Sequence, residues 1–430
     1  MKILHTSDWH VGRTLHRVSR MDETRAALRE VSEIAEREQV DAVVVCGDIF
    51  ESQSPSAEAE QAVYEALQRF CDQGVSVVLI TGNHDHPGRW HALAPLLRRF
   101  NVHVADDLRG PEDGGIVEIR SRDGAESLQI AVVPWVSERR SYTAADLMGR
   151  SEKTYQSYAD SMSTAIHTLC EAFEQGKCHM LAGHVFISGS SVSQSERTLT
   201  IGDIYAVTPN AIPATVQYAA LGHVHMPQKA PGVPVPCRYS GSLLQLDFGE
   251  AGQTKSAVIC ELEPGKPAKI KEVPLSSGRR LRDISGTLES LTLETVDLDC
   301  EYLRVTLTCS GPRPGLSDQV RELLPNALVV KLEYPDNEEV AGVDIRAKSP
   351  RELFQGYLAA RYQSDPSADL LDAFDQLLAE ALGEARPPVG QLLLLDALPP
   401  LSDSAPSRIA ENDPAAEVQA RAEVATVGSG

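Results

Sequence analysis

Several features that would place this chain in other classes of protein are missing from its 430 residues. The eight cysteines include no C-x-x-C pair and no short secreted-type framework, and most lie in apolar sequence, which favours buried free thiols in a reducing compartment. No apolar run approaches the roughly 20 residues needed to span a bilayer, and no basic region followed by an apolar one opens the chain. We therefore expect a cytoplasmic protein without a membrane segment.

What the chain does contain is a series of five short polar motifs, most of them directly after an apolar run. They are Ser7-Asp8-Trp9-His10, Gly47-Asp48, Gly82-Asn83-His84-Asp85, Gly183-His184 and Gly222-His223-Val224-His225. Their mixture of carboxylate and amide oxygen with imidazole nitrogen suits Mn²⁺, Fe²⁺ or Zn²⁺ better than Ca²⁺. Because the motifs are far apart in the sequence, only the fold can gather them, and the expected product is a two-metal phosphoesterase site.

An excess of positive charge is also absent, since the formal net charge is −21. A charge of that sign argues against a protein that wraps nucleic acid with its whole surface. Basic residues nevertheless follow the first and third motifs closely. They are Arg13, Arg17, Arg20 and Arg25 after the first, and Arg89, Arg98 and Arg99 after the third. Either they seat a polyanion or they are solvated surface charge, and the sequence favours neither interpretation.

The first hundred residues alternate between strand and helix patterns. We predict strands at 2–6, 41–46 and 75–80, and amphipathic helices at 23–38 and 57–71. Near-continuous Val/Ile/Leu runs are typical of parallel strands that helices cover on both faces. Ligands of such sheets collect beyond the carboxyl ends of the strands, which is where Asp8, Asp48 and Asn83 fall.

Residues 115–275 are richer in strands. The predicted strands are 116–119, 128–133, 179–182, 216–221 and 256–262, with one longer helix at about 153–175. His184 and His223 again lie just past strand ends. We therefore predict an α/β fold, a sandwich of two mixed sheets flanked by helices, in which both halves bring their motifs to one edge.

The character of the sequence changes around residues 276–282, and we expect four regions: 1–277, 283–348, 349–385 and 386–430. The second is a small α+β module with strands at 302–308 and 327–332 around a helix near 317–324. The third is a helical pair whose first helix starts at Ser349-Pro350 and whose second, at 368–382, carries an apolar stripe that serves as core or as a partner-binding face. The fourth has the composition of a disordered tail.

Each motif residue has a distinct chemical use. Asp8 and His10, two residues apart, would lie on one side of extended backbone and could share a metal. Asp48 is the natural bridge because its carboxylate has two oxygens. Asn83 offers a neutral oxygen, and His84 would point toward substrate with its imidazole held by Asp85.

The alternative for any single histidine is a structural role, to which we assign the histidines outside the motifs: His5, His16, His86, His91, His103, His167 and His179. The same explanation fails for the motifs as a set. Buried carboxylates and imidazoles with no metal would cost several kcal/mol.

The order and composition of the motifs resemble the calcineurin-like metallophosphoesterases and, within them, the SbcD family of bacterial nuclease subunits. The resemblance covers about residues 1–385 and rests on Ile3-Leu4-His5-Thr6-Ser7-Asp8-Trp9-His10, Gly47-Asp48-Ile49-Phe50, Gly82-Asn83-His84-Asp85, Gly222-His223-Val224-His225 and Tyr239-Ser240-Gly241-Ser242. It implies one metal held by Asp8, His10, Asp48 and His225, and a second held by Asp48, Asn83, His184 and His223. It also implies that His84 is the catalytic histidine.

The same resemblance implies two Mn²⁺ per chain, with Mg²⁺ or Fe²⁺ as alternatives, and action on DNA. Among the basic residues named above, the candidates for contact with DNA are Arg13, Arg17, Arg20 and Arg89. The implied activities are 3′→5′ degradation of double-stranded ends, endonucleolytic cutting of single strands and hairpin opening, in DNA repair, recombination and replication. The implied partner is an SbcC-type coiled-coil ATPase, bound through the helices at about 350–382. The module at 283–348 would cap DNA, and a homodimer through the N-terminal domain would form within a heterotetramer.

The chain departs from the family at two places: after the Gly-Asp motif, and in the tail after Arg386, which has no family counterpart. Some relatives carry a histidine shortly after Gly-Asp, whereas this chain has Phe50-Glu51-Ser52, so Glu51 can assist His84 but the balance of exonuclease and endonuclease activity is not fixed. The stretch after Asp48 lacks the Asp-Arg-Gly of phosphoprotein phosphatases. The other candidates are another calcineurin-like enzyme, a phosphodiesterase or phosphatase, against the second of which the missing motif argues, and a non-catalytic DNA-end-binding scaffold.

Overall fold

The computed structural model describes most of the chain. The described ranges are 1–136, 158–193, 195–196, 205–292, 296–297, 300–311, 315–334, 349–362 and 366–381. The chain divides into two compact units, Met1–Pro335 and Asp336–Gly430. Within the described ranges, no helix has both the length and the apolar character that crossing a bilayer requires.

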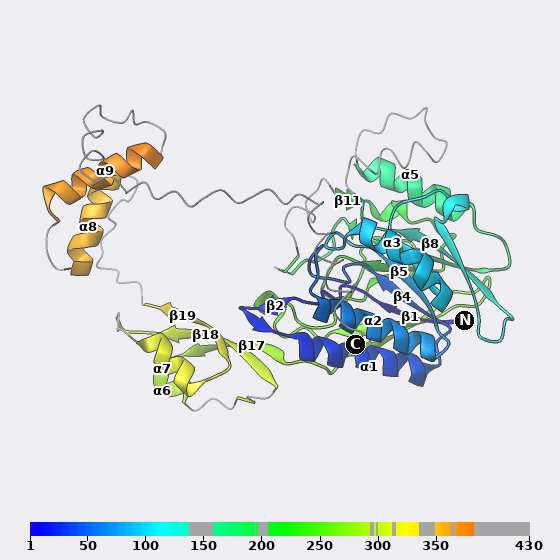
Figure 1. The fold of residues 1–430 in the computed structure, drawn as a ribbon, viewed down its shortest axis with the longest axis horizontal. Helices are drawn as coiled ribbons and strands as arrows, with labels where there is room; N and C mark the ends of the chain where they lie inside the picture. Colours follow the sequence, from blue (N-terminus) through cyan, green and yellow to red (C-terminus); the bar gives the residue numbers. More distant parts are fainter. Residues whose placement is uncertain are drawn as a thin grey trace, which may run out of the picture. The chain divides into compact units, whose positions relative to one another are not determined.

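The first sheet of the larger unit is parallel at its centre and antiparallel at one end (Figure 1). Its strands, in spatial order, are β16 (Lys269–Pro274), β15 (Ser256–Glu261), β1 (Lys2–Thr6), β4 (Ala42–Cys46), β5 (Ser76–Ile80) and β6 (Val102–Ala105). β1, β4, β5 and β6 pair in parallel, whereas β15 is antiparallel to both β1 and β16. β4 and β5 are buried along their whole length, as expected of strands covered on both faces.

The second sheet has the same number of strands and is built from the middle of the sequence. Its spatial order is β13 (Gln228–Lys229), β14 (Cys237–Tyr239), β12 (Tyr218–Gly222), β9 (Cys178–His184), β8 (Ser127–Val133) and β7 (Ile116–Arg120). The four inner strands are parallel, and the two edge strands β7 and β13 are antiparallel to their neighbours.

The two sheets are the inner layers of a four-layer sandwich. Alternate residues of β4 face opposite ways, so Val44 lies in the core between the sheets, whereas Val43 and Val45 pack under helices. These helices are α1 (Met21–Glu38) and α2 (Ala57–Asp72), and α5 (Tyr158–Glu171) covers the outer face of the second sheet. The predicted α/β sandwich of two mixed sheets flanked by helices is thereby confirmed.

One helix of the first half was not predicted. α3 (Pro87–Leu97) begins with Pro87 after His86, whose ring accepts a hydrogen bond from the Arg89 N–H at 3.2 Å. Its apolar residues do not form a single stripe, and Pro95 lies inside it, so a helical period is hard to read.

The short elements are the pairs β2 (Thr14–Leu15) with β3 (Val18–Ser19) and β10 (Phe186–Ile187) with β11 (Ala206–Val207), and the single turns η1 (Arg98–Phe100), η2 (Pro111–Asp113), η4 (Pro209–Ala211) and η5 (Phe248–Glu250).

A three-stranded parallel sheet follows the sandwich within the same unit. It consists of β17 (Arg280–Gly286), β18 (Glu301–Thr308) and β19 (Ala327–Glu333), with helices α6 (Leu288–Leu291) and α7 (Leu316–Leu323). The predicted strands and helix of this module are present, and β17 is an additional strand that starts before residue 283. Val305 and Val320 belong to its own small core.

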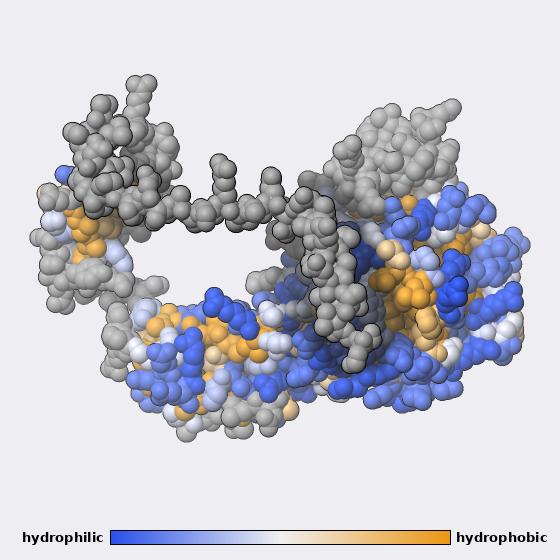
Figure 2. All heavy atoms as spheres, in the orientation of Figure 1, coloured by the Kyte–Doolittle hydropathy of each residue, from blue (hydrophilic) through white to orange (hydrophobic). Residues whose placement is uncertain are grey.

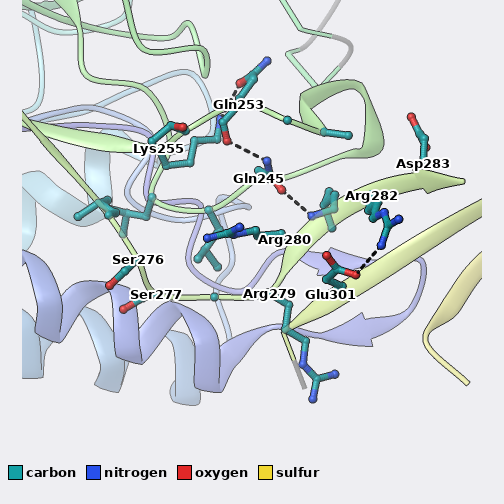
Figure 3. A pocket seen from close by; sticks show the side chains of 18 residues that line it. Gln245, Gln253, Lys255, Ser276, Ser277, Arg279, Arg280, Arg282, Asp283 and Glu301 are labelled. Carbon is teal, nitrogen blue, oxygen red and sulfur yellow. Dashed lines mark hydrogen bonds and ion pairs between the residues drawn. The ribbon is translucent and has the colours of Figure 1, made fainter. Parts of the chain in front are cut away.

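The module meets the sandwich through a small apolar cluster of Leu15, Phe248, Leu281 and Tyr302. Beside this cluster lies a cavity of about 490 Å³, drawn in Figure 3. Gln245 crosses it: its side chain donates to the Gln253 carbonyl at 2.9 Å and accepts the Leu281 N–H of β17 at 2.6 Å. We call this region, from the apolar cluster to the cavity, the junction.

The smaller unit contains two described helices, α8 (Pro350–Tyr362) and α9 (Ala368–Ala381). The rings of Phe354 and Phe374 stack at 4.1 Å between centroids, and Arg351 pairs with Asp372 at 2.8 Å. Both predicted helices are therefore present and pack on each other. The predicted tail, 386–430, lies outside the described residues, as does 283–348 in part.

Candidate metal centre

The polar motifs meet at one edge of the sandwich. Asp8, Asp48 and Asn83 follow β1, β4 and β5, which are neighbours in the first sheet. His184 ends β9 and His223 follows β12, which are neighbours in the second sheet. Since all five strands present their carboxyl ends to this edge, the two packed sheets bring their ligands face to face.

The first group of candidate ligands consists of Asp8, His10, Asp48 and His225, whose ligand atoms all lie within 4.8 Å of one another. All four side chains are buried. The Nε2 atoms of His10 and His225 face each other at 3.0 Å. Two neutral imidazoles in this arrangement can share only one hydrogen, whereas a cation accepts both lone pairs.

The second group consists of Asp48, His184 and His223, again within 4.8 Å. Asn83 joins it, because its Oδ1 lies 2.9 Å from His184 Nε2 and 3.0 Å from His223 Nδ1. The structure thus brings all seven predicted ligands together, in two groups that share Asp48. His223 and His225, although two residues apart, belong to different groups.

The backbone at this edge is not extended, contrary to our expectation for Asp8 and His10. Their φ angles are 50° and 44°, and Asp48 and His223 have φ of 49° and 96°. Left-handed backbone at residues other than glycine costs about 1–3 kcal/mol each and clusters at functional sites. Asp8 and His10 therefore share a group because the loop after β1 curls, not because side chains alternate along a strand.

Two glycines are required because the loops approach so closely. A Cβ on Gly82 would lie 2.1 Å from Asp48 Oδ1, and one on Gly222 would lie 1.8 Å from the Cys46 carbonyl oxygen. Such distances cannot be accommodated, so both positions must lack a side chain. The glycines of the motifs are therefore part of how the site closes around Asp48.

The electrostatics of the centre favour bound positive charge. Burial opposes ionisation of Asp48, yet His184 and His10 hold the pKa of its carboxyl well below the usual range. Burial likewise opposes protonation of His184, but the charge of Asp48 raises the pKa of that imidazole to about 9. A buried set of carboxylate oxygens and imidazole nitrogens with this character fits two divalent cations bridged by Asp48.

His84 lies beside the first group with its ring edge-on to His10, 4.7 Å between centroids. Its Nδ1 lies 2.7 Å from the carbonyl oxygen of Glu51, and its backbone N–H donates to Asp48 Oδ1 at 2.8 Å. Since a carbonyl only accepts, Nδ1 carries the hydrogen and Nε2 is the reactive nitrogen. Burial lowers the pKa of the ring.

Asp85, for which we predicted a role in holding the His84 imidazole, makes three hydrogen bonds to backbone groups. Its carboxylate accepts the backbone N–H groups of Ile49, Phe50 and Gly82 at 3.2, 3.1 and 2.8 Å. Asp85 therefore fastens the loop after β5 to the loop after β4. The Nδ1 of His84 lies against the Glu51 carbonyl oxygen, a backbone atom that side-chain chemistry could not have indicated, and 3.9 Å from the Glu51 carboxylate.

The four predicted DNA-contacting arginines lie in different environments. Arg17 is exposed, and Arg13 is half-buried with its guanidinium 3.4 Å from the Glu51 carboxylate. Arg89 pairs with Glu60 on α2. Arg20 is buried, pairs with Glu23 at 2.6 Å and donates to the carbonyls of Gln245 and Arg279 at the junction.

Two neighbours of the ligands, Trp135 and Glu250, were not assigned from the sequence. Trp135 stacks on His223 at 5.2 Å between ring centroids, and Val133-Pro134-Trp135 directly after a strand was its one signal. Glu51, which we expected to assist His84, contacts His10 with its carboxylate, Oε2 to Nδ1 at 2.9 Å, and the same Oε2 lies 3.9 Å from His84 Nδ1. Glu250 lies behind His225, with no sequence motif to mark it.

Comparison with known proteins agrees with this geometry. Residues 1–227 match the family model described as calcineurin-like phosphoesterase, and residues 277–362 match one described as type 5 capsule protein repressor C-terminal domain. The chain is therefore a metal-dependent phosphodiesterase of the metallophosphoesterase class.

Three curated relatives are named as the SbcD component of the SbcCD nuclease. The protein from Bacillus subtilis (strain 168) is 36% identical over 284 residues, 65% of this chain and 71% of the relative. Those from Rhodobacter capsulatus and Staphylococcus epidermidis are 30% and 25% identical and cover 82% and 83% of this chain, and 93% and 92% of the relatives. The chain belongs to the calcineurin-like phosphoesterases and, within them, to the SbcD family of nuclease subunits.

Proposed function

We propose that the chain is the Mn²⁺-dependent nuclease subunit of an SbcCD-type complex. Its activities would be 3′→5′ degradation of double-stranded DNA ends and endonucleolytic cutting of single strands and hairpins. The observation that carries the proposal is the pair of buried ligand groups sharing Asp48, with His84 beside the first. The relatives named as SbcD nuclease components support a nucleic acid as the substrate.

The residues of the centre have separate roles in phosphodiester hydrolysis. Asp8, His10, Asp48 and His225 would hold one ion, and Asp48, Asn83, His184 and His223 the other. Two such ions, when bound, lower the pKa of a water molecule and offset the charge of the phosphate. His84, held at Nδ1 by the Glu51 carbonyl, presents Nε2 to the phosphate. Once Nε2 has taken up a proton from solvent, the imidazolium stabilises the developing charge or gives that proton to the leaving 3′ oxygen.

Arg13 and Arg17 are the arginines that best suit contact with the DNA backbone. Arg13 contacts Glu51, which in turn contacts the ligand His10, so a phosphate near the centre would lie within reach of its guanidinium. Arg17 is exposed in the turn between β2 and β3. Lysine and arginine contacts to phosphate give affinity without sequence preference, as a nuclease acting on any end requires.

Two further surfaces fit the proposed assembly. Helices α8 and α9 leave Tyr357, Leu370 and Leu377 exposed, at 53%, 46% and 66%, which suits an SbcC-type coiled-coil ATPase as partner. Leu96 and Phe100, each 56% exposed, lie on α3 and η1, and Figure 2 shows hydrophobic surface where Figure 1 labels α3. An apolar patch on that side suits a homodimer within a heterotetramer.

The first test is cleavage of a labelled double-stranded end and of a hairpin, in Mn²⁺ or Mg²⁺, with and without the SbcC-type ATPase. We expect Mn²⁺-dependent cutting by the wild type and none by Asp48→Ala, because that carboxylate belongs to both ligand groups. Cutting that survives in Asp48→Ala would refute the shared ligand. Two bound metals without cutting of any DNA would favour a nucleotide or phosphoprotein as substrate.

A further inference from the structure

A buried ion pair lies directly behind the candidate ligand His225. Glu250, in η5, is fully buried, and Lys255, shortly before β15, is 5% exposed; the Lys255 Nζ lies 2.6 Å from Glu250 Oε2. Removing two charges from water costs several kcal/mol per ion, so a pair of this kind is weak evidence for stability. Its contacts, rather than its existence, point to a role.

The contacts of Glu250 fix the hydrogen on His225. Ser195 Oγ lies 2.6 Å from His225 Nδ1 and donates to Glu250 Oε1, and Glu250 Oε1 itself lies 3.4 Å from Nδ1. An ionised carboxylate only accepts, so the Ser195 hydroxyl gives its hydrogen to Glu250 and takes the one on Nδ1. His225 is then the tautomer whose Nε2 lone pair points into the first ligand group.

Lys255 contacts both the Glu250 carboxylate and the backbone of His225. Besides Glu250, its ammonium donates to the His225 backbone carbonyl at 2.8 Å and to Gln253 Oε1 at 3.0 Å. The second carboxylate oxygen of Glu250 also accepts the Leu246 N–H at 3.0 Å. Neither the carboxylate nor the histidine backbone can therefore rotate independently of the other.

The two ligand groups differ in what lies behind their imidazoles. In the first group, His10 has the Glu51 carboxylate at Nδ1 and His225 has Ser195 and Glu250. In the second, His184 Nδ1 lies 2.9 Å from the carbonyl of Cys46. A carboxylate behind a ligating histidine fixes its orientation and makes it a stronger base than a carbonyl does.

We propose that Glu250, held by Lys255, is the positioning residue for His225 and sets the affinity of the first ligand group for a divalent cation. This inference rests on the metal centre of the proposed function and goes beyond it by separating the two sites. It predicts that the network behind His225 controls one bound ion and leaves the other unaffected.

The test is calorimetric titration of the full chain with Mn²⁺ alone, which counts sites and measures each affinity. For Glu250→Gln we expect one of two Mn²⁺ sites to weaken by about 10–100-fold, the usual cost of losing such a partner, and the other to stay as in the wild type. The control is Glu118→Gln, which breaks the ion pair with Lys177; that lysine directly precedes β9, whereas the ligand His184 ends the strand, so both sites should be unchanged.

A second variant controls for misfolding of Glu250→Gln, which leaves the buried Lys255 without its carboxylate partner. Glu250→Met/Lys255→Met replaces both charges by apolar groups of similar size, which buried pairs often tolerate, and should show the same loss at one site. Unchanged affinities in folded variants, or equal loss at both sites, would overturn the inference while the metal centre stands. A wild type that binds no Mn²⁺ would overturn the proposed function itself.

Discussion

The metal edge of the sandwich and the junction with the β17–β19 module are both built from charged side chains, but they place them differently. At the metal edge the side chains of Asp8, Asp48 and His184 are all buried and face one another. At the junction the ion pairs lie partly in solvent, as with Arg282 and Glu301, whose side chains are 38% and 20% exposed. Only Arg20 is buried there among the arginines named above.

The difference follows from what each region has to do. Burying several charged groups close together costs free energy unless each has a partner of opposite charge. The metal edge therefore tolerates no loss of a partner. Partly exposed pairs contribute about 0–1 kcal/mol each, so the junction can lose most of its pairs at small cost. Substitutions at the metal edge should therefore affect activity strongly, and those at the junction should affect stability by amounts that follow burial.

The largest effect expected is on catalysis, from His84→Ala. Its ring nitrogen Nδ1 is occupied by the Glu51 carbonyl and the residue is outside both ligand groups that share Asp48. We expect cleavage of a labelled DNA end to fall by about 10²–10⁴-fold, as for loss of a general acid, with both Mn²⁺ sites retained in the titration.

The outcome distinguishes a catalytic from a ligating histidine, since His84 also lies within 4.8 Å of His10 and Glu51. Loss of a Mn²⁺ site in His84→Ala would assign the ring to the metal ligands. Normal cleavage would remove it from the mechanism and break the contrast on which the comparison rests.

The next effect is on stability, at the one buried arginine of the junction. Arg20→Met removes the cation paired with Glu23, which keeps its hydrogen bonds from the Arg279 N–H and the Tyr302 hydroxyl, and removes donors to two carbonyls. We expect the free energy of unfolding to fall by about 2–3 kcal/mol, less than the loss of a fully buried pair because Glu23 is 15% exposed. Thermal and urea denaturation would measure it, and the folded variant should bind DNA as the wild type does.

Arg17→Ala is the matched comparison, since Arg17 is exposed in the turn of the short hairpin that ends one residue before Arg20. We expect unfolding within about 0.5 kcal/mol of the wild type and a DNA-binding salt dependence reduced by about one phosphate contact. Weaker DNA binding by Arg20→Met than by Arg17→Ala would reverse the roles that burial assigns to the two arginines.

The same contrast explains what could be read from the sequence. Strand ends, glycines and the ligand types were predictable, because apolar runs place Asp48 and Asn83 at the carboxyl end of one sheet and His184 at that of the other, whatever the loops do. Two features depend on backbone geometry that the residue types do not predict: the left-handed turns at Asp8 and His10, and the Glu51 carbonyl that contacts His84 Nδ1.

Long-range partners were also beyond reach of the sequence. Glu250 lies behind His225 only because η5 and the loop after β12 are brought together by the fold. Arg20 appeared as one of several basic residues after a motif, and only its burial separates it from Arg17. The sequence shows which charged residues are near a site, whereas their burial in the fold determines how much each contributes to stability.

The smallest effect expected is at the exposed end of the junction, where Glu30 of α1 accepts hydrogen bonds from Ser276 and Ser277. The distances are 2.7–3.0 Å to Ser276 and 2.8 Å to the Ser277 N–H. Burial opposes ionisation, but these bonds outweigh it and lower the pKa of Glu30 below its usual value of 4.5. A carboxylate whose pKa is lowered by folding stabilises the folded chain above its unfolded pKa and loses that contribution as pH falls through the folded value.

Glu30→Gln should therefore lower the free energy of unfolding by less than about 1 kcal/mol at pH 7, since the hydrogen bonds between Glu30 and Ser276 are exposed to solvent. The difference from the wild type should shrink as the pH falls below 4.5 toward the lowered pKa of Glu30. Denaturation of both proteins between pH 7 and pH 3 measures it. A difference that stays constant with pH would mean that hydrogen-bond geometry, which glutamine partly keeps, matters more here than charge. A difference as large as that of Arg20→Met would show that exposure does not govern the energetics of the junction.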